Sequence, residues 1–337
     1  MKTKIIQFNL EKVIKDQKRK RIIKNVDKKL LEIIKEDLPF FKLVKRFVVF
    51  SGGKRIRPLT HYYFCKLLNY TGKEWIDVAA IGELIHAASL LHDDVIDNSN
   101  QRRGRPTLHI LYGNKKAILG GDYLLACGID HLQTLEHGSI LLPVFTRVIK
   151  NLSISEILQM EYENNPDLTE EIYEKIIIGK TADLFSAMTE SAAILSSIEI
   201  QKISSYRNYG LKMGRLFQIR DDFLDYFSTE KEMGKELYQD YIRGLITYPL
   251  IVLRKFATNK EKKEIFKDWH NAEKRKSKLP YVLELMEKYQ IRKKIAMEIE
   301  ENIHSLMNFI RNHNTLYHKE REEMLLTLNK LMVPVEI

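Results

Sequence analysis

The 337-residue sequence predicts an all-α protein. Glycine and proline are scarce, at 15 and 8 residues, which favours long helices over the many tight turns of a β-protein. Hydrophobic residues make up 44% of the chain, which is enough for a large buried core. Apolar residues recur with helical spacing along most of the chain, and alternation with a period of two is nowhere sustained. We therefore expect essentially no sheet.

The helical pattern can be followed in order along the chain. It begins at residues 26–36, VDKKLLEIIKE, where one stripe carries Val26, Leu30, Ile33 and Ile34. Residues 75–96 are largely apolar, which indicates a helix buried on most sides. Further helices are expected at residues 115–135, 139–162, 169–190, 199–227 and 245–257, and in several pieces between 276 and 332.

Polar segments interrupt these helices at residues 51–58, 98–106 and 228–244. The segment 259–279 is rich in Lys and Glu, and we expect it to be a solvated connection. No Ser- or Pro-rich linker divides the chain, and no internal repeat is visible. Residues 1–337 are therefore expected to form a single domain.

Composition limits the partners and the compartment. A formal charge of +10 suits nucleic acid, acidic membrane or phosphorylated small molecules, although lysines on solvated helix faces give the same excess. Cys65 and Cys127 lie in apolar stretches without metal-binding spacing, which predicts reduced core residues in a cytoplasmic protein. No stretch approaches the about 18 uncharged apolar residues of a membrane span, and the basic N-terminus lacks the apolar run of a signal peptide.

Two clusters of aspartates stand out near the ends of apolar helical segments. They are Asp93, Asp94 and Asp97 in LLHDDVID, and Asp221, Asp222 and Asp225 in IRDDFLD. The first and last aspartates of a cluster are four residues apart, so they share a helix face and repel each other unless a cation lies between them. Mg²⁺ prefers carboxylate oxygens together with substrate phosphates. One such match arises by chance in roughly one chain in ten, but two in only a few chains per thousand.

Four groups of basic residues stand out, and three of them flank or closely follow these clusters. They are Lys54, Arg55 and Arg57 in SGGKRIRP, Arg102, Arg103 and Arg105 in NQRRGRP, Lys180 beside Thr181 in GKT, and Lys235 in a later GK. Each alone is typical of a surface cation, and only their placement indicates phosphate binding. GGKRIRP lacks the spacing and preceding strand of a P-loop, and no Ser-His-Asp, HExxH or CxxC pattern offers another catalytic site.

Together these segments resemble the trans-isoprenyl diphosphate synthases, also called polyprenyl synthetases. GGKRIRP, GELIHAASLLHDDVIDNSNQRRGRPTLH, GKTADLF, GRLFQIRDDFLD and GK…D…TYPLI occur in the family's order and approximate spacing within about residues 50–250. The resemblance implies the isoprenoid synthase fold, in which long antiparallel helices surround a central cavity, and a homodimer. It also implies a Mg²⁺-dependent prenyltransferase that condenses isopentenyl diphosphate with an allylic diphosphate.

The resemblance also implies a role for each matching residue. The six aspartates would be catalytic together with Lys180, and would hold about three Mg²⁺ ions that bridge the allylic diphosphate. Contacts of the allylic diphosphate would be Arg102, Lys180, Thr181, Gln218 and Lys235. Contacts of isopentenyl diphosphate would be Lys54, Arg57, His86 and Arg103. The allylic C–O bond ionises, the double bond of isopentenyl diphosphate attacks the carbocation, and the released pyrophosphate removes the proton.

Product length is expected to depend on the helix that precedes Asp93. The growing tail should run back along this helix, where Ala88 and Ser89 lie one turn before the aspartate and Ile85 lies deeper. In the family, bulky aromatics at the equivalents of Ala88 and Ser89 stop the product near the farnesyl length. Small residues here predict products longer than twenty carbons, beyond the geranylgeranyl length. The alternative is that Ala88 and Ser89 are small only to let a neighbouring helix pack closely.

Two positions depart from the family's pattern. Leu245 stands where members often carry Lys, which removes one phosphate contact, and Tyr238 stands where Gly is common. Neither departure changes the expected fold.

Other readings remain open. A short-chain synthase making farnesyl or geranylgeranyl diphosphate would differ only in its products, and a non-catalytic subunit of a hetero-oligomeric synthase usually loses one aspartate motif. A class I terpene cyclase would have no use for GGKRIRP and RRG, and a nucleic-acid binder leaves six aspartates unexplained. We expect a cytoplasmic homodimer without a nucleic-acid partner or a transmembrane segment, with peripheral membrane contact for product release.

Overall fold

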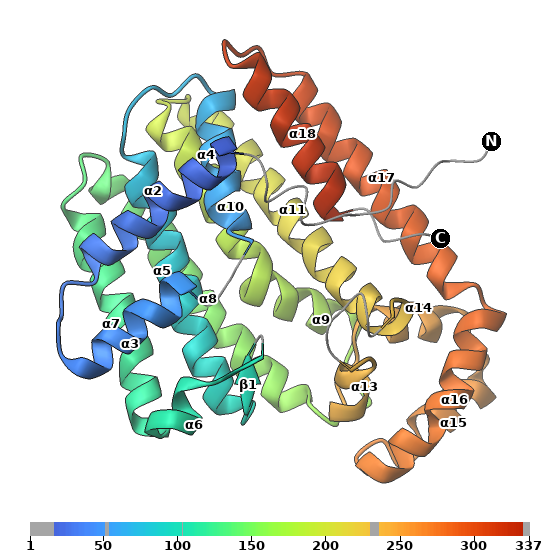
Figure 1. Ribbon diagram of the computed structural model, residues 1–337. Coiled ribbons are helices and arrows are strands. Elements are labelled where there is room, and N and C mark those ends of the chain that lie inside the picture. The colour runs from blue at the N-terminus through green and yellow to red at the C-terminus, as the bar shows by residue number, and fades with distance from the viewer. Residues whose placement is uncertain (1–16, 51–53, 103, 230–235, 333–337) are drawn as a thin grey trace.

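The computed structural model describes residues 17–50, 54–102, 104–229 and 236–332 (Figure 1). Its helices are α2 (Gln17–Ile33), α3 (Pro39–Phe50), α4 (Ile56–Leu67), α5 (Trp75–Ile96), α6 (Leu108–Tyr112), α7 (Asn114–Gln133), α8 (Gly138–Tyr162), α9 (Glu170–Ile177), α10 (Asp183–Leu195), α11 (Ile200–Phe227), α13 (Gln239–Arg243), α14 (Tyr248–Phe256), α15 (Asn259–Phe266), α16 (Ala272–Lys288), α17 (Ile291–Arg311) and α18 (His318–Met332). A π-helical turn, η1 (Ile178–Ala182), joins α9 to α10. Two-residue strands β1 (Gln101–Arg102) and β2 (Arg105–Pro106) pair antiparallel, so the prediction of an all-α protein is confirmed.

Helices α5, α10 and α11 form the centre of the molecule. Every residue of α10 is buried, and α5 is buried on most sides, as its apolar sequence predicts. Helix α10 packs against both α4 and α11, while α2 and α7 cover α5. Two glycines allow α11 to approach closely: a Cβ at Gly210 would lie 2.4 Å from Ser186 Cα, and one at Gly214 would lie 2.4 Å from Ala182 Cα. This close crossing brings the C-terminal half of α11 beside η1.

The C-terminal helices brace the outer side of α11. Helix α17 packs on α11, α14 and α18, and α18 also contacts α4 (Figure 1). No helix among the described residues is long and apolar enough to cross a membrane. Cys65 is buried and Cys127 is half-buried, and neither forms a disulfide. The pKa of the Cys65 thiol is raised because burial disfavours the thiolate.

One segment differs from its predicted structure. Residues 259–279 were expected to be a solvated connection, but they contain α15 and the start of α16. A capping box between Thr258 and Glu261 starts α15. Ile265 and Trp269 are 2% and 1% exposed, so this lysine-rich segment still covers a part of the core. The prediction is wrong because two buried side chains are too few to give a visible apolar stripe.

Candidate active site

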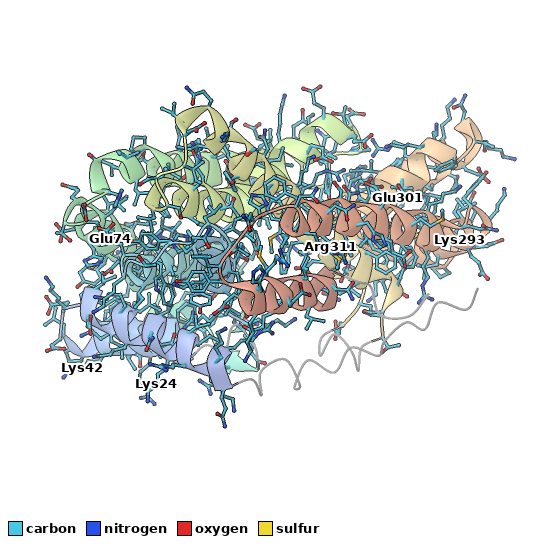
Figure 2. The ribbon with its side chains drawn as sticks, turned by 90° about the horizontal axis from the view of Figure 1, so that it is seen from above. Lys24, Lys42, Glu74, Lys293, Glu301 and Arg311 are labelled. Atoms are coloured by element: carbon cyan, nitrogen blue, oxygen red, sulfur yellow. The ribbon has the colours of Figure 1, made fainter. Side chains whose placement is uncertain are left out.

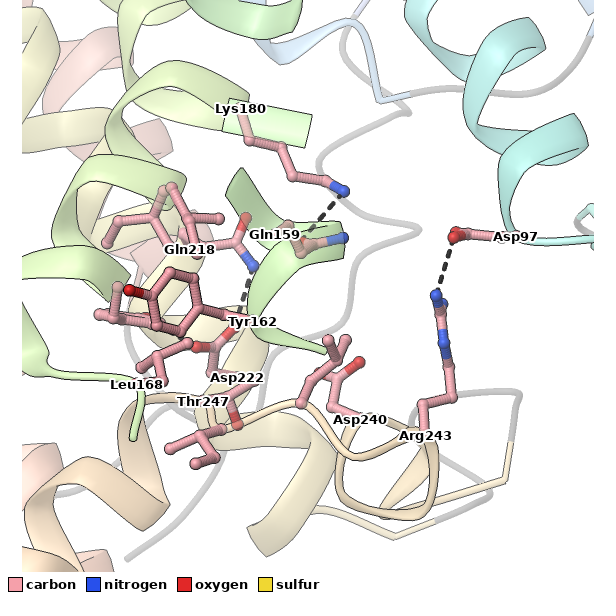
Figure 3. A pocket seen from close by; sticks show the side chains of 15 residues that line it. Asp97, Gln159, Tyr162, Leu168, Lys180, Gln218, Asp222, Asp240, Arg243 and Thr247 are labelled. Carbon is pink, nitrogen blue, oxygen red and sulfur yellow. Dashed lines mark hydrogen bonds and ion pairs between the residues drawn. The ribbon is translucent and has the colours of Figure 1, made fainter. Parts of the chain in front are cut away.

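The two aspartate clusters lie on different helices and meet at one pocket. Asp97 follows the end of α5 and Asp222 lies in the last turns of α11, and both line a pocket of about 230 Å³ (Figure 3). Lys180 of η1 lines the same pocket. We call it the Asp97–Asp222 pocket. A second pocket of about 400 Å³, lined by Arg57, lies next to it and is called the Arg57 pocket. Gln218 lines both, so the two pockets share a wall.

The aspartates of the first cluster have different surroundings. Asp94 is 1% exposed, and Arg102 Nε donates to its Oδ1 at 2.8 Å. Its Oδ2 is buried and accepts no hydrogen bond from the described residues. Asp97 Oδ1 accepts a hydrogen bond of 2.8 Å from Arg243 Nη2. Burial raises the pKa of Asp93 to about 7, and the negative charge of Asp97 adds to this shift while nearby cations oppose it.

The second cluster is held by a network of hydrogen bonds around Asp222. Its Oδ2 accepts from Tyr173 Oη at 2.7 Å and from the backbone N–H of Tyr248 at 3.1 Å, and its Oδ1 accepts from Gln218 Nε2 at 2.9 Å. Thr181 Oγ1 donates in turn to Gln218 Oε1 at 2.7 Å. The network fixes the orientation of Asp222, because three donors converge on one carboxylate. Burial nevertheless raises the pKa of Asp222 to about 7, helped by the charge of Asp240.

The other two aspartates of this cluster face different environments. Asp221 is half-exposed and lines the Arg57 pocket, with Arg220 Nη1 3.4 Å from its Oδ1. Asp225 is 1% exposed, and its Oδ2 lies 3.4 Å from the backbone N–H of Asp240. The two clusters therefore present carboxylates to both pockets.

The π-helical turn places Lys180 between the clusters. Its Nζ lies 2.7 Å from Glu156 Oε1 and 3.4 Å from Gln159 Oε1, both on α8. A π-helical turn inserts an extra residue into a helix and is frequent at functional sites. Gly179 is needed here because a Cβ would lie 2.6 Å from the backbone oxygen of Asn151. The turn therefore packs directly on α8 and directs Lys180 toward the pocket.

The Arg57 pocket contains the predicted isopentenyl diphosphate contacts that the structure describes. Lys54, Arg57 and His86 line it, as do Arg102 and Thr181 of the predicted allylic set. Its apolar side is formed by Phe47, Val48, Ala87, Leu90, Phe185 and Phe217. The guanidinium of Arg57 lies over the Phe185 ring at 5.0 Å, and burial lowers its pKa. A cationic end and an apolar wall thus meet in one cavity.

Arg55 also lines the Arg57 pocket, but its guanidinium is paired with carboxylates of the protein. Its guanidinium lies 2.5 Å from Glu83 and 2.9 Å from Asp27, and its side chain is only 7% exposed. The residue adopts a left-handed conformation with φ of 48° immediately before α4. Its charge is neutralised by two carboxylates, so Arg55 anchors the start of α4 to α2 and α5. This anchoring positions its neighbours Lys54 and Arg57.

The predicted length-determining residues lie on α5, and Ile85, Ala88 and Ser89 are not among the residues that line either pocket. Ala88 is fully buried and Ile85 is 1% exposed. Ser89 is half-buried, and its Oγ donates to the backbone oxygen of His86 at 2.9 Å. Their effect on product length remains a prediction. Arg103 and Lys235, two of the predicted diphosphate contacts, lie outside the described residues.

The two departures from the family's pattern lie on either side of α13. Leu245 lines the Asp97–Asp222 pocket and brings no charge to it. Tyr238 adopts φ of 61° just before α13, a left-handed conformation that glycine adopts without strain. Its backbone N–H donates to Asp225 O at 3.0 Å, and its ring contacts Tyr226 edge-on. The structure thus gives a physical reason for a glycine preference at position 238.

Several functional candidates were missed in the sequence. Gln159, Tyr173 and Arg243 line the pocket from α8, α9 and α13, and Glu156 of α8 pairs with Lys180. In the sequence, each of them looks like an ordinary polar residue on a helix. They come to the site only because segments distant in sequence pack together.

The donor set fits a divalent cation that is held together with substrate. Burial raises the pKa of Asp93 and of Asp222 to about 7, and Asp94 Oδ2 is buried and accepts no hydrogen bond from the described residues. Within the described ranges, no three acidic, His or Cys side chains converge closely enough to hold a metal by themselves. Mg²⁺ typically takes one or two carboxylates plus phosphate oxygens and water, so this arrangement suits it.

Comparison with known proteins bears on the family and the fold. A model of the family described as "Polyprenyl synthetase" matches residues 40–286. The octaprenyl diphosphate synthase of Escherichia coli K12 is 34% identical over 245 residues, which cover 72% of this chain and 75% of the relative. The geranylgeranyl diphosphate synthase of Saccharolobus solfataricus is 33% identical over 276 residues, which cover 80% of this chain and 83% of the relative. A crystal structure of a decaprenyl diphosphate synthase from Rhodobacter capsulatus matches with a TM-score of 0.83 and 28% identity, covering 97% of this chain and 99% of that chain.

Proposed function

This chain belongs to the polyprenyl synthetase family, and we propose that it is an all-trans polyprenyl diphosphate synthase. As a member of this family it is a prenyltransferase with the isoprenoid synthase fold. The proposed reaction joins isopentenyl diphosphate to an allylic diphosphate. The observation that carries the proposal is the meeting of Asp97, Asp222 and Lys180 at one pocket, from three separate elements.

The two pockets divide the substrates between them in this proposal. The allylic diphosphate binds in the Asp97–Asp222 pocket, where Lys180 and Gln218 contact it. The diphosphate of isopentenyl diphosphate binds in the Arg57 pocket, where Lys54 and His86 accompany Arg57. The shared wall at Gln218 keeps the two reacting carbon chains adjacent. Orientation of two reactants in neighbouring sites can lower a barrier by about 7–11 kcal/mol.

The six aspartates are proposed to hold Mg²⁺, about three ions per site, together with phosphate oxygens. Bound Mg²⁺ would stabilise the negative charge that develops on the leaving diphosphate. Lys180 contributes positive charge at the same end of the substrate. Phe185 and Phe217 line the neighbouring pocket with apolar surface, which excludes water from the reactive carbon chain.

Products are proposed to be longer than the geranylgeranyl length. Ala88 and Ser89 are small, so the part of α5 one turn before Asp93 carries no bulky barrier. The octaprenyl and decaprenyl synthases named above support a long product, whereas the relative from Saccharolobus supports the short-chain alternative. The short side chains on α5 favour the long-chain reading.

A homodimer is part of the proposal. Large apolar side chains are exposed along α6, α7 and α8: Ile110, Leu111, Leu119, Ile140, Ile154, Ile157 and Met160. Exposed apolar side chains gathered on neighbouring helices are typical of protein–protein interfaces. A second copy of this chain is the proposed occupant, because a two-fold dimer buries the same surface of both copies.

Peripheral membrane contact in the cytoplasm completes the proposal. The outer faces of α2 and α3 carry exposed cations, among them Lys20, Arg21, Lys24, Lys42 and Arg46. Figure 2 shows Lys24 and Lys42 at the same edge of the molecule. Each basic residue near an anionic leaflet contributes about 1 kcal/mol of attraction. A water-insoluble product could pass from the enzyme to lipid at this face.

The experiment that tests the function measures incorporation of labelled isopentenyl diphosphate into extractable product with an allylic primer. We expect incorporation with Mg²⁺ and none in EDTA. Asp93→Ala and Asp221→Ala should each lower turnover by about a hundredfold or more with helicity intact, because each loses a ligand of a charge-stabilising ion. Glu273→Ala, at an exposed site on α16, is the matched control. Near-normal turnover in both aspartate variants would refute the assignment.

A further inference from the structure

Arg243 joins the two walls of the Asp97–Asp222 pocket. Its Nη2 donates to Asp97 Oδ1 at 2.8 Å, although the two residues are 146 positions apart in the chain (Figure 3). Among the described residues that line this pocket, the cations are Lys180 and Arg243. The ion pair therefore connects α13 with the end of α5 across the proposed diphosphate site.

The backbone of helix α13, which carries Arg243, is held in place by hydrogen bonds to α16. Arg275 of α16 donates from Nε to Tyr241 O at 3.0 Å and from Nη2 to Ile242 O at 2.7 Å, and Tyr241 Oη donates back to Arg275 O at 3.0 Å. Gly244 follows with φ of 89°, where a Cβ would lie 2.2 Å from Asn164 Oδ1. The backbone at Arg243 is thus held from two sides.

The side chain of Arg243 is more accessible than its backbone. It is 37% exposed, and within the described part of the chain it donates a hydrogen bond to Asp97 across the pocket. Lys180, by contrast, lies 2.7 Å from Glu156 and 3.4 Å from Gln159. Leu245 lies beside Arg243 in the pocket and has no charge to offer. Arg243 is therefore the cation that this side of the pocket can present to an anion.

The carboxylate that Arg243 holds belongs to the proposed metal-binding set. A divalent cation at Asp97 would neutralise this carboxylate and repel the guanidinium, which weakens the ion pair with Arg243. An arginine released from Asp97 would remain in the pocket because its backbone is clamped. Its planar fork then suits a diphosphate, which presents two or more oxygens to the guanidinium.

We propose that Arg243 is a releasable latch that holds Asp97 in the unliganded protein and transfers to the diphosphate of the allylic substrate when a divalent cation takes Asp97. The inference rests on the proposed function and deepens it. It assigns the diphosphate contact on the α13 side of the pocket to Arg243, two residues before the uncharged Leu245. No covalent step is involved, and each contact is an ion pair that forms or breaks.

The test uses Arg243→Gln and two binding measurements without turnover. Binding of Mn²⁺ alone, followed by electron paramagnetic resonance, should tighten by about fivefold because the competing cation is gone. Binding of inorganic pyrophosphate in excess Mg²⁺, followed by calorimetry, should weaken by about tenfold because a charge-assisted contact is lost. A purely structural role would not move the two affinities in opposite directions. Leu245→Lys, added to Arg243→Gln, should restore much of the pyrophosphate affinity.

Lys255→Gln provides the matched control. Lys255 forms a similar partly exposed ion pair between helices, 2.7 Å from Glu170, and it lines neither pocket. This variant should leave both affinities unchanged. The latch would be overturned if Arg243→Gln bound pyrophosphate as tightly as wild type, or if it bound both Mn²⁺ and pyrophosphate more weakly. Either result would leave the proposed function standing. Failure of the wild-type protein to bind pyrophosphate with Mg²⁺ would overturn the proposed function and the latch with it.

Discussion

At the scale of single residues, ionised Asp93 and Asp222 are buried carboxylates, and their burial lowers the stability of the folded protein at neutral pH. Each has a pKa near 7 in the folded protein because burial disfavours the carboxylate, against about 3.9 in an unfolded chain. The folded state therefore binds a proton more tightly than the unfolded state does. The stability that this tighter proton binding adds is fully present below about pH 4 and is lost as the pH rises through about 7. A cation bound at neutral pH would remove this cost.

Asp222→Asn tests the argument directly. The substitution should raise the free energy of unfolding at pH 8 without Mg²⁺ by about 1–3 kcal/mol, because an uncompensated buried charge is removed. A flip of Gln218 and a rotation of the Thr181 hydroxyl would let the new amide keep its hydrogen bonds. The gain should shrink at pH 5, where Asp222 is already protonated, and turnover should fall by about a hundredfold.

Denaturant unfolding at both pH values, with wild-type protein as the reference, measures the effect. An Asn variant that is less stable than wild type at pH 8 would contradict the account of Asp222. Equal changes at pH 5 and pH 8 would do the same, because they would show that titration of the carboxylate is not involved.

At the scale of elements, the π-helical turn η1 depends on its contact with α8. Gly179→Ala would place a Cβ 2.6 Å from the backbone oxygen of Asn151, which cannot move aside like a flexible side chain. We expect a loss of about 1–3 kcal/mol of stability from overpacking. Pyrophosphate binding with Mg²⁺ should weaken as well, because Lys180 is displaced from the pocket.

The matched control for this element is Gly128→Ala on α7. A Cβ there would make only ordinary contacts, at 3.8 Å from Ile81 and Leu84. This change should be neutral or stabilising, by up to about 1 kcal/mol, because alanine favours helix. Thermal unfolding and calorimetry compare the two variants. If Gly179→Ala matched Gly128→Ala in both measurements, the close contact of η1 with α8 would have no functional role.

Helix α5 carries the prediction of product length. Ser89→Phe should shorten the products to about the farnesyl or geranylgeranyl length, because the ring would block a tail that runs back one turn, about 5.4 Å, from Asp93. Ala88→Phe should act in the same direction but cost stability, since Ala88 is fully buried. Ser89→Ala is the control and should leave the products unchanged. Unaltered products in Ser89→Phe would place the barrier elsewhere.

Elements with a strong apolar pattern were predictable from sequence. The limits of α5 agree with the predicted 75–96, because its apolar run is long and ends at the polar segment that follows Asp97. Helix α13 and the helices within 259–279 were not predicted, since a five-residue helix and a helix with one or two buried side chains give almost no periodic signal. Both aspartate clusters were found because their residue types repeat within a short motif.

The contacts that complete the site could not be read from sequence. Arg243 meets Asp97 from 146 residues away, and Tyr173 meets Asp222 from 49 residues away. Such pairs follow from the packing of α9, α11 and α13, and no local pattern records which polar residue will face a pocket. The motif residues were therefore predictable, whereas their hydrogen-bonding partners required the fold.

At the scale of the whole molecule, the close-packed centre creates the site. Glycines on α11 allow it to lie against η1 and α10, and this brings the second cluster opposite the first. Two adjoining pockets result, one with three carboxylates and two cations and the other with a cationic end and an apolar wall. That pairing suits two diphosphate substrates with hydrocarbon tails, and it is the central claim of the proposed function.

The most direct test is the length of the product. The wild-type protein is incubated with labelled isopentenyl diphosphate, Mg²⁺ and, separately, geranyl, farnesyl and geranylgeranyl diphosphates, and the dephosphorylated products are separated by chromatography. The account predicts Mg²⁺-dependent products longer than the geranylgeranyl length. Products that stop at farnesyl or geranylgeranyl would contradict the long-chain assignment. Absence of any elongation with all three primers would contradict the enzyme function itself.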